Sequence, residues 1–194
     1  KKGVKQSGGT PREFCTITVT DGIAMGHEGM KSSLISREVI ADSAELTVRG
    51  HCYDALVGIA GCDKSLPGLM MSMLRLNVPS VFIYGGSILP GKFKGKDVTV
   101  VDVFEAVGKH SSGKMSTEEL KELELVACPS AGACGGQFTA NTMACVSEAI
   151  GLALPYSAGT PAPYEERDKY AFESGQTVMN LLEKKIKPRD IVNK

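Results

Sequence analysis

Two cysteines in short glycine-containing loops are the residues of this chain whose surroundings best suit chemistry. Cys62 lies in the run GCDK (61–64), and Cys134 lies in the run ACGG (133–136). A cysteine that only fills a core does not need polar neighbours and glycines. A thiolate is a soft ligand for iron, and an aspartate is a hard ligand that suits magnesium. We therefore interpret the two loops as parts of a metal centre.

The Cys62 loop combines ligands of different character. Adjacent Cys62 and Asp63 suggest two different metals side by side. The cation of Lys64 would repel both metals, so Lys64 fits only when it is deprotonated and modified, for instance carbamylated by carbon dioxide to give a carboxylate ligand. The alternative is a turn with a buried thiol and a surface ion pair. Asp21-Gly22 is a third candidate, although such pairs are also common in turns.

The Cys134 loop consists of small residues, which let the backbone approach a cofactor closely. A predicted helix follows it, and a helix N-terminus favours the thiolate. Cys128 and Cys134 could instead form a redox pair, but their spacing is wider than the two-residue gap of thioredoxin-like motifs. A tightly packed turn of small residues is the structural alternative.

Composition narrows the class of protein. The hydrophobic content of 42% suffices for a packed core, and the 22 basic residues balance the 22 acidic ones. This balance argues against nucleic acid or an anionic membrane as the main partner. No apolar stretch is long enough to span a bilayer. We expect a small-molecule substrate instead.

The six cysteines are too sparse for a disulfide scaffold. Cys15, Cys52, Cys128 and Cys145 have apolar, strand-like or helical neighbours, so we interpret them as core thiols. The pattern is typical of a reducing compartment. We expect the cytoplasm, or an organelle matrix.

Alternating strands and helices must position these loops. We predict strands at 14–19, 55–60 and 81–84, the second being nearly continuous in apolar residues. Polar loops follow each strand. The order predicts a layered α/β/α domain with a mainly parallel sheet, in which strand ends share one edge and bind ligands.

Helices are predicted between the strands and after them. The first begins at Ser32 or Ser33, which would cap it, and its apolar stripe contains Leu34, Val39, Ile40, Ala44 and Leu46. Others are expected near 69–76, 99–109, 116–125, 139–152 and 165–185, and residues 87–97 are expected to be loop. We expect residues 1–194 to be a single α/β domain and a piece of a longer protein, truncated at both ends.

Four blocks of sequence resemble those of the dihydroxy-acid and phosphogluconate dehydratases. They occur in the family's order and extend over nearly the whole chain. The blocks are TDGIAMGH (20–27), SREVIADS (36–43), GCDK (61–64) and CPSAGACGGQFTANTM (128–143). Around the second cysteine the match is closer to the dihydroxy-acid enzymes than to their sugar-acid relatives.

This resemblance implies an iron–sulfur hydro-lyase that converts 2,3-dihydroxy-3-methyl acids to 2-keto acids in valine and isoleucine biosynthesis. Cys62 and Cys134 match cluster ligands. Asp21 and Asp63 match magnesium ligands, and Lys64 matches a carbamylated lysine ligand. The family also implies a homodimer.

The resemblance is incomplete in ways that affect the site. A further cluster cysteine lies upstream of the matched region in the family, so a 2Fe-2S and a 4Fe-4S cluster both remain open. A magnesium-binding glutamate and the catalytic serine base lie in a C-terminal β-barrel domain that this chain lacks. We expect no catalytic base in this chain, and no activity of it alone. The alternatives are a sugar-acid dehydratase of the same family and a non-catalytic cluster-binding domain.

Overall fold

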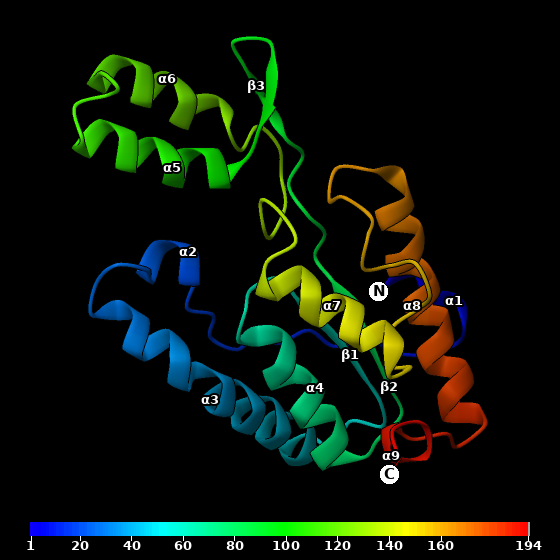
Figure 1. Ribbon diagram of the computed structural model, residues 1–194. Coiled ribbons are helices and arrows are strands. Elements are labelled where there is room, and N and C mark those ends of the chain that lie inside the picture. The colour runs from blue at the N-terminus through cyan, green and yellow to red at the C-terminus, as the bar shows by residue number, and fades with distance from the viewer. Residues whose placement is uncertain (194) are drawn as a thin grey trace.

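Two parallel strands form the centre of the fold (Figure 1), in a computed structural model that describes residues 1–193. Strand β1 is Leu56–Ala60 and strand β2 is Ser80–Tyr84, which confirms the predicted strands at 55–60 and 81–84. Their register pairs Leu56 with Ser80 and Ala60 with Tyr84. Both strands therefore end at the same edge of the sheet.

Helices α3, α4 and α7 form the layer on one side of this sheet (Figure 1). Helix α3 is Gly29–Gly50, α4 is Ser65–Leu76 and α7 is Thr139–Ala149. Helix α4 lies so close to β1 that a Cβ atom added at Gly58 would be 2.5 Å from the methyl carbon of Met73. The main hydrophobic cluster joins these helices to Phe82 and Tyr84 of β2.

Helix α8, Glu165–Glu183, contacts both strands from the other side, and α1, Lys2–Gln6, packs on α8. Short helices α2, Asp21–Ala24, and α9, Pro188–Ile191, complete this part of the chain. The mixed α/β class with a parallel sheet is thus confirmed. The cover of the sheet is uneven, since Ile83 is buried whereas Ile59 on β1 is 68% exposed.

A second group of elements projects from the sheet (green, at the top of Figure 1). Strands β3, Gly91–Phe93, and β4, Lys96–Val98, form an antiparallel hairpin. Helices α5, Val100–Ser111, and α6, Thr117–Val126, pack beside it. Their small hydrophobic cluster contains Val98, Ala106, Leu123 and Ala127.

The hairpin corrects the prediction of loop at 87–97. Lys94 and Gly95 both have positive φ, 49° and 79°, which is the conformation that a two-residue hairpin turn requires. The strands are too short to show an alternating pattern in the sequence. The two helices after the hairpin were predicted correctly, and those from 139 and 165 begin where expected.

The predicted strand at 14–19 is wrong. This segment has no regular structure and pairs with no strand in the described part of the chain. It lies against the helical layer instead: the ring of Phe14 is 6.4 Å from that of Tyr53, and Thr16 hydrogen-bonds to Ser43 of α3. Its alternating residues fit an extended chain, but an extended chain is a strand only when a partner pairs with its backbone.

Helix α3 differs from its prediction at the start and on its buried face. It begins at Gly29, so neither Ser32 nor Ser33 caps it. Leu34, Val39 and Leu46 of the predicted stripe are exposed. The buried face instead carries small residues beside Ile40 and Val48; they are Ser33, Ser36, Ala41 and Ala44. Close packing against α4 favours small side chains, and apolar periodicity alone does not detect them.

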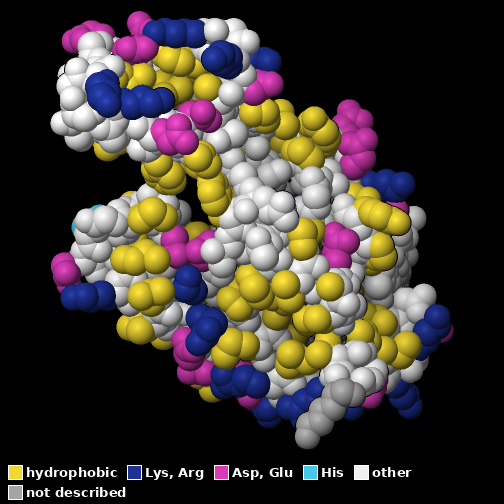
Figure 2. All heavy atoms as spheres, viewed as in Figure 1, with side chains coloured by type: hydrophobic (Ala, Val, Ile, Leu, Met, Phe, Trp, Pro, Cys, Tyr) yellow, Lys and Arg dark blue, Asp and Glu magenta, His cyan; other side chains and the backbone are white. Residues whose placement is uncertain are grey.

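The interpretation of four cysteines as core thiols is also wrong. Cys15, Cys52, Cys128 and Cys145 are all exposed, whereas Cys62 and Cys134 are half-buried. Several large apolar side chains are exposed as well, among them Ile23, Leu34, Ile35 and Leu46, and Figure 2 shows hydrophobic side chains spread over the face in view. Within residues 1–193, no helix has the length and apolarity needed to cross a membrane.

Candidate metal centre

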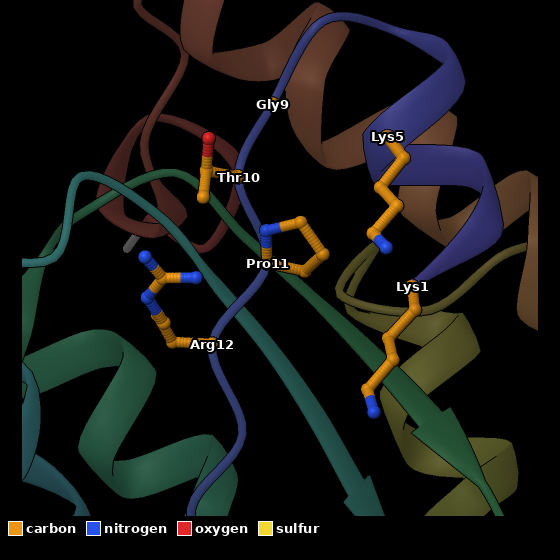
Figure 3. A pocket seen from close by; sticks show the side chains of 6 residues that line it. All are labelled: Lys1, Lys5, Gly9, Thr10, Pro11 and Arg12. Carbon is orange, nitrogen blue, oxygen red and sulfur yellow. The ribbon is translucent and has the colours of Figure 1, made fainter.

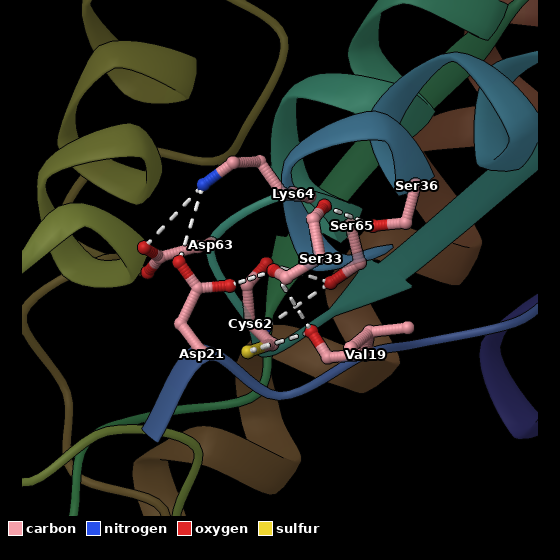
Figure 4. A network of polar contacts seen from close by, with 8 residues as sticks. All are labelled: Val19, Asp21, Ser33, Ser36, Cys62, Asp63, Lys64 and Ser65. Carbon is pink, nitrogen blue, oxygen red and sulfur yellow. Dashed lines mark hydrogen bonds and ion pairs between the residues drawn. The ribbon is translucent and has the colours of Figure 1, made fainter. Parts of the chain in front are cut away.

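Two aspartates and a lysine meet at the edge where β1 ends (Figure 4). Asp63 and Lys64 lie in the turn between β1 and α4, and Asp21 begins α2. The Nζ atom of Lys64 lies 3.2 Å from Oδ2 of Asp21 and 3.7 Å from Oδ2 of Asp63. The structure thus brings together three predicted ligands from two distant segments.

Ser33 on the buried face of α3 fixes the orientation of Asp21. Its side chain is fully buried, and its hydroxyl donates a hydrogen bond to Oδ1 of Asp21. The hydroxyl of Ser36, one turn further along, donates to the backbone oxygen of Ser33 at 2.7 Å. One carboxylate oxygen of Asp21 therefore faces α3, and the other faces Lys64 (Figure 4).

The pKa values of the two carboxyl groups shift in opposite directions. Burial raises the pKa of Asp63, and the neighbouring Asp21 raises it further. Burial also acts to raise the pKa of Asp21, but hydrogen bonds from Asp63, Ser33 and Lys64 outweigh it, so the pKa of Asp21 is lowered. Asp21 is therefore the carboxylate that stays ionised, and Asp63 takes up the first proton.

Cys62 lies in the same turn as Asp63. Its backbone N–H donates to Oγ of Ser65 at 3.1 Å, and that hydroxyl donates back to the Cys62 carbonyl at 2.7 Å. The thiol lies 3.9 Å from the carbonyl oxygen of Val19, just before Asp21 (Figure 4). The turn after β1 thus holds a thiol and a carboxylate at adjacent positions.

Cys134 reaches this edge because its loop extends the sheet beyond β2. Ser87 and Cys134 form an isolated parallel bridge, and Ile88 N–H donates to the Cys134 carbonyl at 2.8 Å. Glycine makes the approach possible: a Cβ atom added at Gly61 would be 2.7 Å from Cβ of Ala133. The loop therefore packs directly against the residue before Cys62.

The pKa of the Cys134 thiol depends on its burial and on the charges of Asp63 and Cys62. Burial raises its pKa, and the charges of Asp63 and Cys62 raise it further, although backbone hydrogen bonds from Gly136 and Phe138 act in the opposite direction. The loops that carry all five predicted site residues therefore lie at the same edge of the sheet. Both Cys128 and Cys134 are free thiols.

The acidic and sulfur groups do not form a complete ligand set by themselves. Among residues 1–193, no three histidine, cysteine, aspartate or glutamate side chains converge to hold a metal ion. Two carboxylates and an intervening lysine are what the structure supplies. A third anionic ligand at this place would require chemical modification of Lys64 or a residue from outside the described chain.

Three residues near the site were not predicted from sequence. Ser33 was considered only as a helix cap, although buried serines spaced three apart, such as Ser33 and Ser36, are an available signal. Tyr84 ends the apolar run of β2, and Arg167 reaches its backbone from α8. An aromatic residue in an apolar strand and an arginine in a polar helix give no local signal of this contact.

Two hollows lie on the surface of the described chain, and none of the five predicted site residues lines either of them. A hollow of about 280 Å³ adjoins the Cys134 loop and is lined in part by Ser87, Gly135, Gly136 and Asn141. Another of about 260 Å³ lies among residues 1–12 (Figure 3) and is lined by Lys1, Lys5, Gly9, Thr10, Pro11 and Arg12. The side chains of Lys1, Lys5 and Arg12 are exposed, and none of the five site residues lines this second hollow.

Comparison with known sequences assigns the chain to a family. Residues 1–194 match the family model described as dihydroxy-acid/6-phosphogluconate dehydratase N-terminal. The chain therefore belongs to this family of dehydratases and corresponds to its N-terminal part.

Individual proteins similar to this chain are named dihydroxy-acid dehydratase, which is narrower than the name of the family model. The chain is 90% identical over 194 residues to the dihydroxy-acid dehydratase of Pelagibacter ubique strain HTCC1062. It is 81% identical over 194 residues to that of Parvibaculum lavamentivorans, and 56% identical over 192 residues to that of Metallosphaera sedula. These matches cover 99–100% of this chain but only 34% of each relative. The chain therefore spans about a third of the length of these proteins.

The hydrogen bond from Ser33 gives a prediction for the metal-free protein. Because Asp21 has a lowered pKa, its ionised form stabilises the fold above pH 3.8, and this contribution is lost as the pH falls through the lowered value. Ser33→Ala removes a donor, so the pKa of Asp21 should rise and the fold should lose about 1–3 kcal/mol near neutral pH. NMR titration of the Asp21 carboxyl carbon and urea unfolding measure the two effects.

Ser32→Ala is the matched control, because Ser32 is the exposed neighbour of Ser33 on the same helix. It should leave both the Asp21 titration and the unfolding curve unchanged. An Asp21 pKa that stays the same in Ser33→Ala would contradict the assigned hydrogen bond.

Proposed function

We propose that the longer protein is a hydro-lyase, a dihydroxy-acid dehydratase that depends on an iron–sulfur cluster and magnesium. It would convert 2,3-dihydroxy-3-methyl acids to 2-keto acids in valine and isoleucine biosynthesis. The observation that carries the proposal is the contact of Lys64 with Asp21 and Asp63 at the edge of the parallel sheet where the loops of Cys62 and Cys134 also lie. Family membership supports the reaction class.

The thiols fit an iron–sulfur cluster. Thiolates are the usual protein ligands of such clusters, and Cys62 and Cys134 are the two half-buried cysteines of the described chain. A buried hydroxyl without a hydrogen-bond partner, that of Tyr84, belongs to the same neighbourhood. We assign Cys62 and Cys134 as cluster ligands, with the remaining ligation supplied from outside this chain.

The oxygen ligands fit magnesium on one condition. Asp21 and Asp63 supply the carboxylates that magnesium prefers. The ammonium group of Lys64 would repel the ion, since its Nζ lies 3.2 Å from one of these carboxylates. Carbamylation would replace this positive charge by a carboxylate and make Lys64 a third ligand.

The chain's own residues would hold and orient these groups. Ser33 keeps one oxygen of Asp21 engaged and leaves the other directed to the site. The hollow beside the Cys134 loop would admit a small molecule next to this loop. When bound, the two metal centres supply Lewis acids for the leaving hydroxyl and for the substrate carboxylate. The base that removes the proton is expected outside this chain.

The exposed apolar face of α3 would be covered in the longer protein. The exposed apolar side chains of α3, such as Leu34, Ile35 and Leu46, would meet the rest of the longer chain or a second subunit of a homodimer. We propose that the present segment alone is inactive and is one α/β domain of the enzyme. The balanced charge suits neither nucleic acid nor an anionic membrane as partner, and we place the enzyme in the cytoplasm or an organelle matrix.

Iron binding by the full-length protein tests the cluster ligands. Cys62→Ser and Cys134→Ser should each lower the iron content and the visible absorption after anaerobic reconstitution, and dehydration should fall by about 100-fold or more, because a lost metal ligand weakens the centre further than a lost supporting residue. Iron analysis, absorption and a keto-acid assay give the three values.

Cys52→Ser is the matched control, because Cys52 is exposed at the end of α3 and away from the sheet edge. It should keep iron and activity. Full activity in Cys62→Ser or Cys134→Ser would refute the ligand assignment, and an iron-free wild-type protein would refute the cluster.

The lysine modification has its own test. Lys64→Arg keeps the positive charge but cannot be carbamylated, so dehydration by the full-length protein should fall by about 100-fold or more. Mass spectrometry under carbon dioxide should detect the carbamate on wild-type Lys64. Lys31→Arg, at an exposed position of α3, is the control. Unchanged activity of Lys64→Arg would exclude the carbamate as a ligand.

The other substrate class of the family is the second candidate. We expect the full-length protein to dehydrate 2,3-dihydroxyisovalerate at least tenfold faster, by kcat/KM, than phosphogluconate or aldonates, because the names of the similar proteins favour the dihydroxy acids. Parallel assays at equal substrate concentrations would measure this. A preference for phosphogluconate would assign the protein to the sugar-acid branch, and iron binding without any dehydration would favour a cluster-binding domain.

A further inference from the structure

Tyr84 is a buried residue that the site described so far does not use. It is the last residue of β2, and only 1% of its surface is exposed. Its hydroxyl is buried and has no hydrogen-bond partner among the described residues. Buried hydroxyl groups in folded proteins nearly always have a partner, so this one calls for an acceptor from outside the described residues.

The position of Tyr84 in the sheet places it beside the loops that carry both thiols. Tyr84 pairs with Ala60 in the sheet register, and Cys62 follows Ala60 by one intervening glycine. On its own strand, the chain runs from Tyr84 through two glycines to Ser87, which pairs with Cys134. Cys134 itself packs against the hydrophobic cluster that contains Tyr84.

The electrostatic surroundings agree with this position. Burial raises the pKa of Tyr84, and among nearby groups the charge of Cys134 contributes most to this rise, with smaller effects of Cys62 and Asp63. The phenol therefore stays protonated at neutral pH and keeps its hydrogen available for donation.

Arg167 holds the tyrosine in place from α8. Its guanidinium donates to the backbone oxygen of Tyr84 at 2.8 Å and to that of Ser157 at 2.7 Å, and also to that of Thr160. Its Cζ atom lies over the tyrosine ring, 5.9 Å from the ring centroid. A cation over the ring withdraws negative charge from the phenol, which makes the hydroxyl a better donor.

We propose that the Tyr84 hydroxyl donates a hydrogen bond to sulfur of the iron–sulfur group held by Cys62 and Cys134. The proposal rests on the function proposed above. Its consequence is electronic: a hydrogen bond to sulfur stabilises the more negative, reduced form of a cluster and so raises the reduction potential.

The test is the reduction potential of the reconstituted full-length protein. Tyr84→Phe keeps the ring and removes the donor, so the equilibrium constant for reduction should fall at least threefold. At 59 mV for each tenfold change in a one-electron couple, this is a shift of about 30 mV to lower potential. An anaerobic titration with dithionite, followed by visible absorption, measures it, and resonance Raman spectra should show altered iron–sulfur stretches.

Tyr156→Phe is the matched control. It removes the same hydroxyl group, but from a tyrosine that is 81% exposed. Its potential and spectrum should equal those of the wild type. If wild type and Tyr84→Phe both bind iron and have the same potential and the same spectrum, the hydrogen bond is refuted while the proposed function stands. A wild-type protein that binds no iron refutes both.

A second variant keeps the test decisive if Tyr84→Phe fails to hold iron. Replacing Tyr84 by a monofluorinated tyrosine preserves the size and gives a stronger donor, so the potential should move to higher values. An unchanged or lowered potential in that iron-loaded variant overturns the proposal.

Discussion

The parallel pairing of β1 with β2 is the constraint on which the site depends. The ladder continues one step past the strands, where Gly85 N–H donates to the Ala60 carbonyl at 2.9 Å. Both strands then turn at glycines, and the absence of side chains there admits the Ala133 loop to the same edge. The loops that carry the thiols and the carboxylates consequently lie at one edge, as expected for the carboxyl edge of a parallel sheet.

Within that edge, one ammonium group balances two carboxylates. Lys64 offsets part of the repulsion between Asp21 and Asp63, and Ser33 satisfies the remaining oxygen of Asp21. The ammonium group of Lys64 thus lies between the two carboxylates. The same contacts hold the two carboxylates in position.

Local patterns were sufficient for the buried strands, most helices and the loops that carry Cys62, Asp63, Lys64 and Cys134. They failed where the outcome depends on distant partners. Residues 14–19 have the composition of a strand but no strand beside them, and the hairpin around Lys94 and Gly95 is too short for a pattern. The roles of Ser33, Tyr84 and Arg167 arise from contacts between segments far apart in sequence, which a single sequence does not display.

The approach of Ala133 to Gly61 also bears on the order in which the protein assembles. Cys62 reaches its turn through contacts close in sequence, whereas Cys134 arrives only when its loop pairs with Ser87 beyond β2. Long-range pairings of this kind form slowly, because a large loop must close first. Until that edge has closed, the two thiols are therefore separate from one another and open to oxidants.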